Sequence, residues 1–160
     1  ALVGVAMSEP LILFVGELNP YRSPPGLDLY DEPAYASGAR LRKLVLGIPR
    51  RIYLGPLVGR RNLCRGIWSM ASAKTAAAGV LEEFPTAVVV TLGAKVSAAF
   101  AKATMTPAPA LFESRGRVVR LPHPSGLCRE WHTPGAFDRA RRVLANTCPG
   151  IRWGIDLEES

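Results

Sequence analysis

The sequence predicts an α/β domain in which a central, mostly parallel sheet of four strands lies between two layers of helices. Short, fully apolar, β-branched runs are typical of strands buried on both faces, and they alternate with helical patterns of about 10 to 16 residues. This alternation is typical of a parallel sheet covered on both faces. The sequence contains no internal repeat and no long linker, so residues 7–160 are expected to form one domain.

The first half of the chain contains two predicted strands and one predicted helix. Residues 11–15 form a continuous apolar run that ends at a glycine, as a buried strand does. Residues 19–33 are rich in Pro, Gly and Asp and are expected to form a loop. Ser37 is expected to cap a helix that runs to residue 46. The apolar stretch 52–58 is expected to form the second strand, although it contains a glycine and a proline.

The second half continues the alternation. An alanine-rich stretch that ends at Pro85 predicts a helix, and the run A-V-V-V-T-L after it predicts a strand. Thr133 followed by Pro134 is a favourable helix start, with a cap and then a first-turn proline. The predicted elements are helix 69–84, strand 87–92, helix 93–103, strand 117–121 and helix 133–145.

Composition narrows the class of protein. A hydrophobic content of 48% with 21% charged residues indicates a globular chain, and no apolar run reaches the ~18 residues of a membrane helix. The formal charge of +7 favours a polyanionic partner, because binding phosphates to Lys and Arg releases counterions. The three cysteines include no C-x-x-C pair, so they are expected to be inert thiols. No metal site and no cofactor are expected. Residues 1–6 make a poor signal peptide and are expected to be a leader or an added segment. The protein is expected to be soluble, cytoplasmic and monomeric.

Two polar loops follow predicted strands. Residues 16–21 (G-E-L-N-P-Y) come after the first strand, and residues 123–129 (H-P-S-G-L-C-R) come after the last. In a parallel sheet, ligands bind beyond the carboxyl ends of the strands, so both loops are expected at one site.

These two segments resemble the two signature motifs of the uracil-DNA glycosylase superfamily, and residues 88–101 resemble the strand–Gly–helix between them. The resemblance covers residues 11–144 and implies a uracil-DNA glycosylase-like fold, with altered DNA as substrate and base-excision repair as the process. The first loop has one extra residue between Gly16 and Asn19. Asn19 therefore matches the Asp/Asn-Pro-Tyr core in one alignment, whereas Glu17 matches the Gly-Glu opening of the iron–sulfur members in another. The cluster cysteines of those members are absent, which favours the first alignment.

The resemblance implies a role for each catalytic residue. Asn19 is expected to place the attacking water, with Glu17 or Asp28 as the source of a carboxylate. A simple Asn-Pro turn is the alternative for Asn19. His123 is expected to donate a hydrogen bond to the departing base, and a neutral imidazole suffices for this.

The resemblance also implies residues that bind the base and the DNA. Base-binding residues are expected to be Tyr21, Tyr30 and Asn62, although core packing or turn formation explains the last two as well. Leu127 is expected to be an apolar wedge that fills the space left by the flipped base, or else a leucine that anchors its loop. The remaining residues expected to contact DNA are Ser125, Gly126 and Arg129.

Two other functions stay open. The same fold could act on a nucleotide or a modified base outside repair, or it could bind nucleic acid or protein without catalysis. Base release from an oligonucleotide, turnover of a mononucleotide, and binding without turnover distinguish the three.

Overall fold

The computed structural model describes residues 9–19, 27–33 and 36–154. It confirms an α/β fold, built on a sheet in the order β2-β1-β3-β5-β4. The described sheet has five strands rather than the expected four, and all neighbours pair in parallel except β4 and β5. The extra strand, β4, has only two residues and left no periodic signal. The strands are β1 (Ile12–Asn19), β2 (Val58–Arg65), β3 (Val88–Leu92), β4 (Ser114–Arg115) and β5 (Val118–Leu121).

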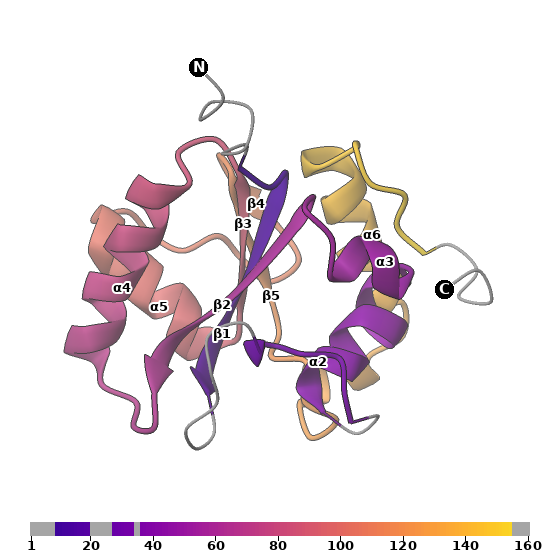
Figure 1. The fold of residues 1–160 in the computed structure, drawn as a ribbon, viewed down its shortest axis with the longest axis horizontal. Helices are drawn as coiled ribbons and strands as arrows, with labels where there is room; N and C mark the ends of the chain where they lie inside the picture. The colour runs from indigo at the N-terminus through magenta and orange to yellow at the C-terminus, as the bar shows by residue number, and fades with distance from the viewer. Residues whose placement is uncertain (1–8, 20–26, 34–35, 155–160) are drawn as a thin grey trace.

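Helices cover both faces of the sheet (Figure 1). One face packs against α4 (Met70–Glu83) and α5 (Ala94–Thr104). The other face carries α2 (Ser37–Arg40), its π-helical continuation η2 (Leu41–Leu46), α3 (Arg50–Tyr53) and α6 (Ala136–Thr147). The short 3-10 helix η3 (Arg129–His132) precedes α6. None of the described helices is long and apolar enough to cross a lipid bilayer.

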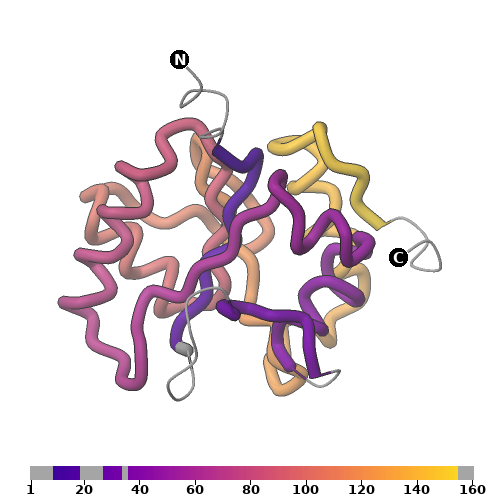
Figure 2. The backbone as a smooth tube through the Cα atoms, in the orientation of Figure 1, coloured from indigo at the N-terminus to yellow at the C-terminus, as the bar shows by residue number. Residues whose placement is uncertain are grey.

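Strand β1 lies between the two cores, as its continuous apolar run predicts. Ile12 and Phe14 belong to the core on the α6 side, whereas Leu13 and Val15 belong to the core under α4 and α5. Successive side chains of a strand point to opposite faces, and a core lies on each face of the sheet, so all four side chains are buried. The tube in Figure 2 shows β1 passing through the middle of the molecule.

The second strand was predicted in the wrong place. Residues 50–53 form α3, and the strand is β2, which begins at Val58. β2 reads V-G-R-R-N-L-C-R and lies at the edge of the sheet, where its polar side chains are only partly buried. The Arg60 guanidinium lies over the Tyr53 ring, and Arg61 lies over Phe84, so arginine stems supply the packing that apolar residues supply elsewhere.

Most other boundaries are close to the predictions. The helix expected at residues 37–46 is present as α2 and η2, but its N-cap is Ala36, which makes no side-chain cap, so the prediction for Ser37 was wrong. The last helix begins at Ala136, with Gly135 as N-cap at φ 76°, rather than at Thr133. The expected helices under the sheet and the strands β3 and β5 are confirmed within about two residues.

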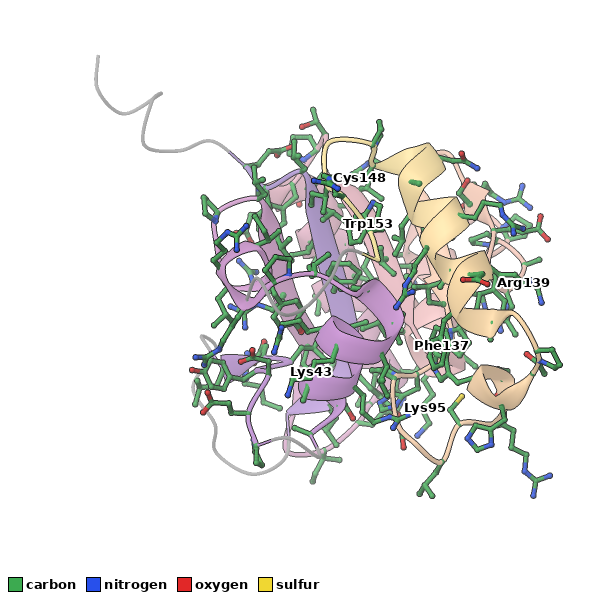
Figure 3. All side chains as sticks on the ribbon, turned by 90° about the vertical axis from the view of Figure 1, so that its right-hand side faces the viewer. Lys43, Lys95, Phe137, Arg139, Cys148 and Trp153 are labelled. Atoms are coloured by element: carbon green, nitrogen blue, oxygen red, sulfur yellow. The ribbon has the colours of Figure 1, made fainter. Side chains whose placement is uncertain are left out.

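An aromatic cluster fixes the segment between β5 and α6. The rings of Trp131 and Phe137 stack at 5.4 Å, and Phe112 meets Trp131 edge-on at 5.6 Å. Figure 3 shows Phe137 and Arg139 on α6, with Cys148 and Trp153 in the segment that follows it. The cluster holds this segment close to the carboxyl end of β5.

Candidate functional site

The carboxyl ends of β1, β2, β3 and β5 lie along one edge of the sheet, because these strands are parallel. The segment from Gly16 to Asn19 was expected to be a loop, but it continues β1. It pairs with β2, and the partners are Gly16 with Asn62 and Asn19 with Arg65. The apolar pattern ends at Val15, yet backbone pairing with β2 extends the strand by four residues.

His123 follows β5 and packs against the start of α5. A Cβ atom built on Gly93 would lie 3.4 Å from the His123 Cβ and 3.7 Å from its Cδ2, which are ordinary contact distances, so the glycine is favoured here by its φ of 102° rather than by lack of space. The backbone N–H of Ser125 donates to His123 Nδ1 at 3.1 Å. Since Nδ1 accepts, the neutral ring carries its proton on Nε2 and presents an N–H donor there.

Burial keeps this imidazole neutral. Desolvation lowers the pKa of His123 below its usual 6.5, and the charge of Glu17 opposes that shift. The indole Nε1 of Trp131 donates to the backbone carbonyl of His123 at 2.7 Å, which joins the histidine to the aromatic cluster. The arrangement is a neutral hydrogen-bond donor that its own hydrogen bonds orient at the edge of the sheet.

Glu17 reaches the same place from the end of β1. Its carboxylate is 3.1 Å from Lys95 Nζ in the first turn of α5, and 27% of its side chain is exposed. Strand β3 separates β1 from β5, yet both residues reach the start of α5, where Glu17 pairs with Lys95 and His123 lies beside Gly93. The structure therefore brings together two of the three residues expected to be catalytic.

The third expected catalytic residue, Asn19, is the last residue of β1, and its side chain lies outside the described residues, as does the whole of Tyr21. Tyr30 is described, and its ring already has a partner. Its hydroxyl accepts a hydrogen bond from Arg50 at 2.8 Å, and the Arg50 guanidinium lies 5.6 Å from the ring centre. A base that stacks on Tyr30 must share the ring with this cation.

Asn62 lies within β2 rather than after the second strand. Its side chain crosses Gly16, since a Cβ atom on Gly16 would come closer than 3.0 Å to Asn62 Oδ1. The Asn62 backbone N–H donates to Asp28 at 2.9 Å. The glycine of the first motif therefore makes room for the asparagine amide, and the two predicted site elements are in direct contact.

An ion pair that the sequence does not reveal holds residues 27–33, here named the strap, against β2. Arg65 donates two hydrogen bonds to Asp28, at 3.1 and 2.8 Å, and Asp28 is 0% exposed. Arg42 and Arg50 hold Asp31 in the same strap. A carboxylate so enclosed cannot place a water molecule for attack, so of the two carboxylates proposed for that role only Glu17 is accessible.

The loop of residues 123–128, here named the His123 loop, is closed by its own hydrogen bonds. Ser125 Oγ accepts from the Leu127 N–H at 3.2 Å, while Arg40 Nε donates to the Pro124 carbonyl at 3.0 Å. The Arg40 guanidinium also lies against Gly126. Leu127 projects from this loop with 91% of its surface exposed, so it does not anchor the loop to the core.

Arg129 is exposed and begins the 3-10 helix η3 rather than lying in the loop. The three cysteines are free thiols, two of them buried. Among the described residues, no group of three His, Cys, Asp or Glu side chains could hold a metal ion.

Comparison of the chain with models of protein families, with curated proteins and with solved structures gives no match.

Proposed function

We propose that the chain is a DNA glycosylase that hydrolyses the N-glycosidic bond of uracil or a related damaged base, in a three-layer domain of the uracil-DNA glycosylase type. The observation that carries the proposal is that Glu17 and His123 both lie against the start of α5 at the carboxyl edge, Glu17 through Lys95 and His123 beside Gly93, where His123 is held as a neutral Nε2–H donor. The two motifs that carry the resemblance are the ones that contribute these residues.

The role of His123 follows from where charge develops. When the glycosidic bond breaks, its electron pair leaves with the base, and negative charge builds on a base carbonyl oxygen. A fixed N–H donor at that oxygen stabilises the transition state more than the ground state. A neutral donor also avoids burying a cation, in keeping with the lowered pKa of His123.

The water that attacks the sugar needs an acceptor for its proton. Glu17 is partly exposed and is fixed by Lys95, so its carboxylate can bind a water molecule and take the proton as the hydroxyl joins the sugar carbon. Asn19 would orient the same water through its amide. In this proposal Glu17 is the base and Asn19 the orienting group.

The exposed Leu127 fits the wedge role, because a wedge must project from the surface to enter a duplex. The N–H groups of Ser125 and Leu127 are used inside the loop, which leaves the Ser125 hydroxyl proton and the Arg129 guanidinium for a flanking phosphate. Asn62, held across Gly16, would read the hydrogen-bonding edge of the base.

The test is base release from a panel of oligonucleotides that each carry one altered base, in single-stranded and duplex form. We expect His123→Ala and Glu17→Gln to reduce the rate by about 10²- to 10⁴-fold. Glu82→Gln, which removes an exposed carboxylate from α4, is the matched control and should leave the rate unchanged.

Each other outcome contradicts the proposal in a defined way. Turnover of a mononucleotide without activity on DNA would favour a nucleotide N-glycosidase. Salt-sensitive DNA binding without release of any base, unchanged by either substitution, would favour a non-catalytic binding module.

A further inference from the structure

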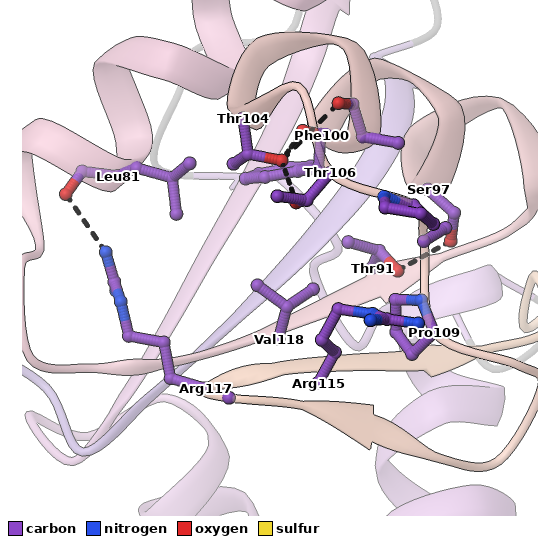
Figure 4. Close-up of a pocket in the computed structure, with 14 residues that line it drawn as sticks. Leu81, Thr91, Ser97, Phe100, Thr104, Thr106, Pro109, Arg115, Arg117 and Val118 are labelled. Atoms are coloured by element: carbon purple, nitrogen blue, oxygen red, sulfur yellow. Dashed lines mark hydrogen bonds between the residues drawn. The ribbon is translucent and has the colours of Figure 1, made fainter.

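A cavity of about 350 Å³ lies between α5 and the β4–β5 hairpin at the amino end of β5 (Figure 4). It exists because α4 and α5 pack on β1, β2 and β3 and leave this face of β5 without a helix. The burial of β5 alternates accordingly: Val119 is buried in the core on the α6 side, while Val118 is half-buried and lines the cavity. The volume is at the lower end of the ~300–1,000 Å³ range of small-molecule sites.

The walls suit a flat apolar body. Phe100 and Leu81 line one side and Val118 the other. The polar groups of the floor satisfy each other: the hydroxyls of Thr91 and Ser97 are 2.7 Å apart, and Thr91 also donates to the Val119 carbonyl. Because these buried hydroxyls already have partners, an apolar ligand can cover them without leaving a hydrogen bond unmade.

The charged groups of the lining are all positive. The two arginines of the hairpin, Arg115 and Arg117, are the charged residues around the cavity, and no carboxylate lines it. Arg117 is fixed by the carbonyls of Leu81, Phe84 and Ala87, and Figure 4 shows its side chain reaching toward Leu81. Arg115 points the other way, toward Pro109; it is exposed, and no acidic side chain in the described part of the chain pairs with it.

We propose that this cavity binds a small aromatic monoanion, with its ring system between Phe100 and Val118 and its carboxylate on the Arg115 guanidinium. The ring buries apolar surface that the missing helix would otherwise cover. The carboxylate meets a guanidinium whose planar fork matches it in a bidentate pair. The hairpin lies at the amino end of β5, so this site is separate from the proposed glycosylase site at its carboxyl end, and either site can exist without the other.

The probe is 2-naphthoate, with the neutral 2-naphthamide as its matched ligand, both titrated by calorimetry and by amide chemical shifts. We expect saturable one-to-one binding of naphthoate, with the largest shifts near Phe100 and Val118, and an affinity about tenfold weaker for the amide. Arg115→Gln should weaken naphthoate about tenfold and leave naphthamide unchanged. Arg142→Gln, which removes an exposed charge from α6, should change neither.

Ala101→Phe tests the cavity itself, since the added ring from α5 would occupy the proposed space and abolish binding of both ligands. Arg115 is exposed, so Arg115→Gln keeps the fold and decides the charge claim even if Ala101→Phe is unstable. The proposal is overturned if naphthoate does not saturate, if the two ligands bind equally, or if a folded Ala101→Phe variant still binds them.

Discussion

Gly38→Ala should strongly destabilise the protein, because the strap leaves no room for a methyl group. A Cβ atom on Gly38 would lie closer than 3.0 Å to the carbonyl oxygens of Leu29 and Tyr30, whereas ordinary contacts begin near 3.4 Å. Both obstacles are backbone atoms, so the strap itself must move away from the helix. The Tyr53 hydroxyl, which donates to the Leu29 carbonyl at 2.6 Å, is 0% exposed and would lose its partner.

Two effects lower the free energy of unfolding of Gly38→Ala. Leaving a buried hydroxyl without its partner costs about 1–3 kcal/mol. Overpacking a tight contact costs about another 1–3 kcal/mol, so Gly38→Ala should lower the free energy of unfolding by about 2–6 kcal/mol. Urea denaturation measures this difference.

Gly79→Ala is the matched control. It lies inside α4 with nothing within 4 Å of the added Cβ, so the same substitution should raise stability by about 0.5–1 kcal/mol through helix propensity. If Gly38→Ala unfolds at the urea concentration of the wild type, the close approach of strap and helix is wrong.

Burial lowers the pKa of His123, so the unfolded chain binds a proton on this residue at higher pH than the folded chain does. The free energy of unfolding should therefore fall as the pH drops below about 6.5. Urea denaturation at pH 7.5 and 5.5 should show a smaller fall for His123→Gln than for the wild type. An identical pH dependence in both proteins would contradict the buried imidazole. Leu127→Ala should change stability by less than about 0.5 kcal/mol, because the side chain is 91% exposed, but should slow excision from duplex more than from single strands; equal losses would argue against a wedge. Arg65→Gln removes both hydrogen bonds that Arg65 donates to the buried Asp28, so it should lower the free energy of unfolding by about 2–4 kcal/mol. Arg61→Gln breaks an exposed ion pair and should lower it by less than about 1 kcal/mol. Thermal or urea unfolding measures both differences. Similar losses for the two arginines would refute the role of the strap ion pair.

The parts of the fold that the sequence predicts well are those where one physical signal dominates. β1 and β3 are central strands buried on both faces, so their apolar runs predict them directly. β2 fails because it is an edge strand in which arginine stems replace apolar side chains. The strand at the opposite edge of the sheet, β4, has two exposed residues that pair with β5 and carry no apolar pattern.

The candidate site shows the same division. The placement of His123 and Glu17 at one edge follows from strand direction alone, and it was predicted. The tautomer of His123 depends on a hydrogen bond from Ser125 two residues away, which no spacing rule reveals. The enclosure of Asp28 depends on Arg65, 37 residues later in the chain, and a run of arginines in a sequence does not indicate which of them faces a buried carboxylate.

The structure shows that part of the positive charge is already engaged by partners within the protein. A formal charge of +7 predicts attraction to DNA, and that long-range field does not depend on what each arginine contacts. Direct phosphate contacts do depend on it. Many guanidinium groups already have partners within the molecule: Arg42 and Arg50 bind Asp31, Arg65 binds Asp28, Arg117 binds the carbonyls at the end of α4, and Arg141 binds the carbonyls of Leu44 and Val45.

Salt dependence separates these two contributions. Each phosphate contact adds about 0.9 to the slope of log affinity against log salt, whereas an arginine that cannot leave its internal partner adds nothing. If the protein binds DNA through the His123 loop, Arg129→Gln should reduce the slope by about one, because Arg129 is exposed beside Leu127. Arg117→Gln should leave the slope unchanged while it lowers stability, since its guanidinium holds three backbone carbonyls. A fall in slope for Arg117→Gln equal to that for Arg129→Gln would mean that internal arginines reach phosphate, and net charge alone would then describe DNA binding.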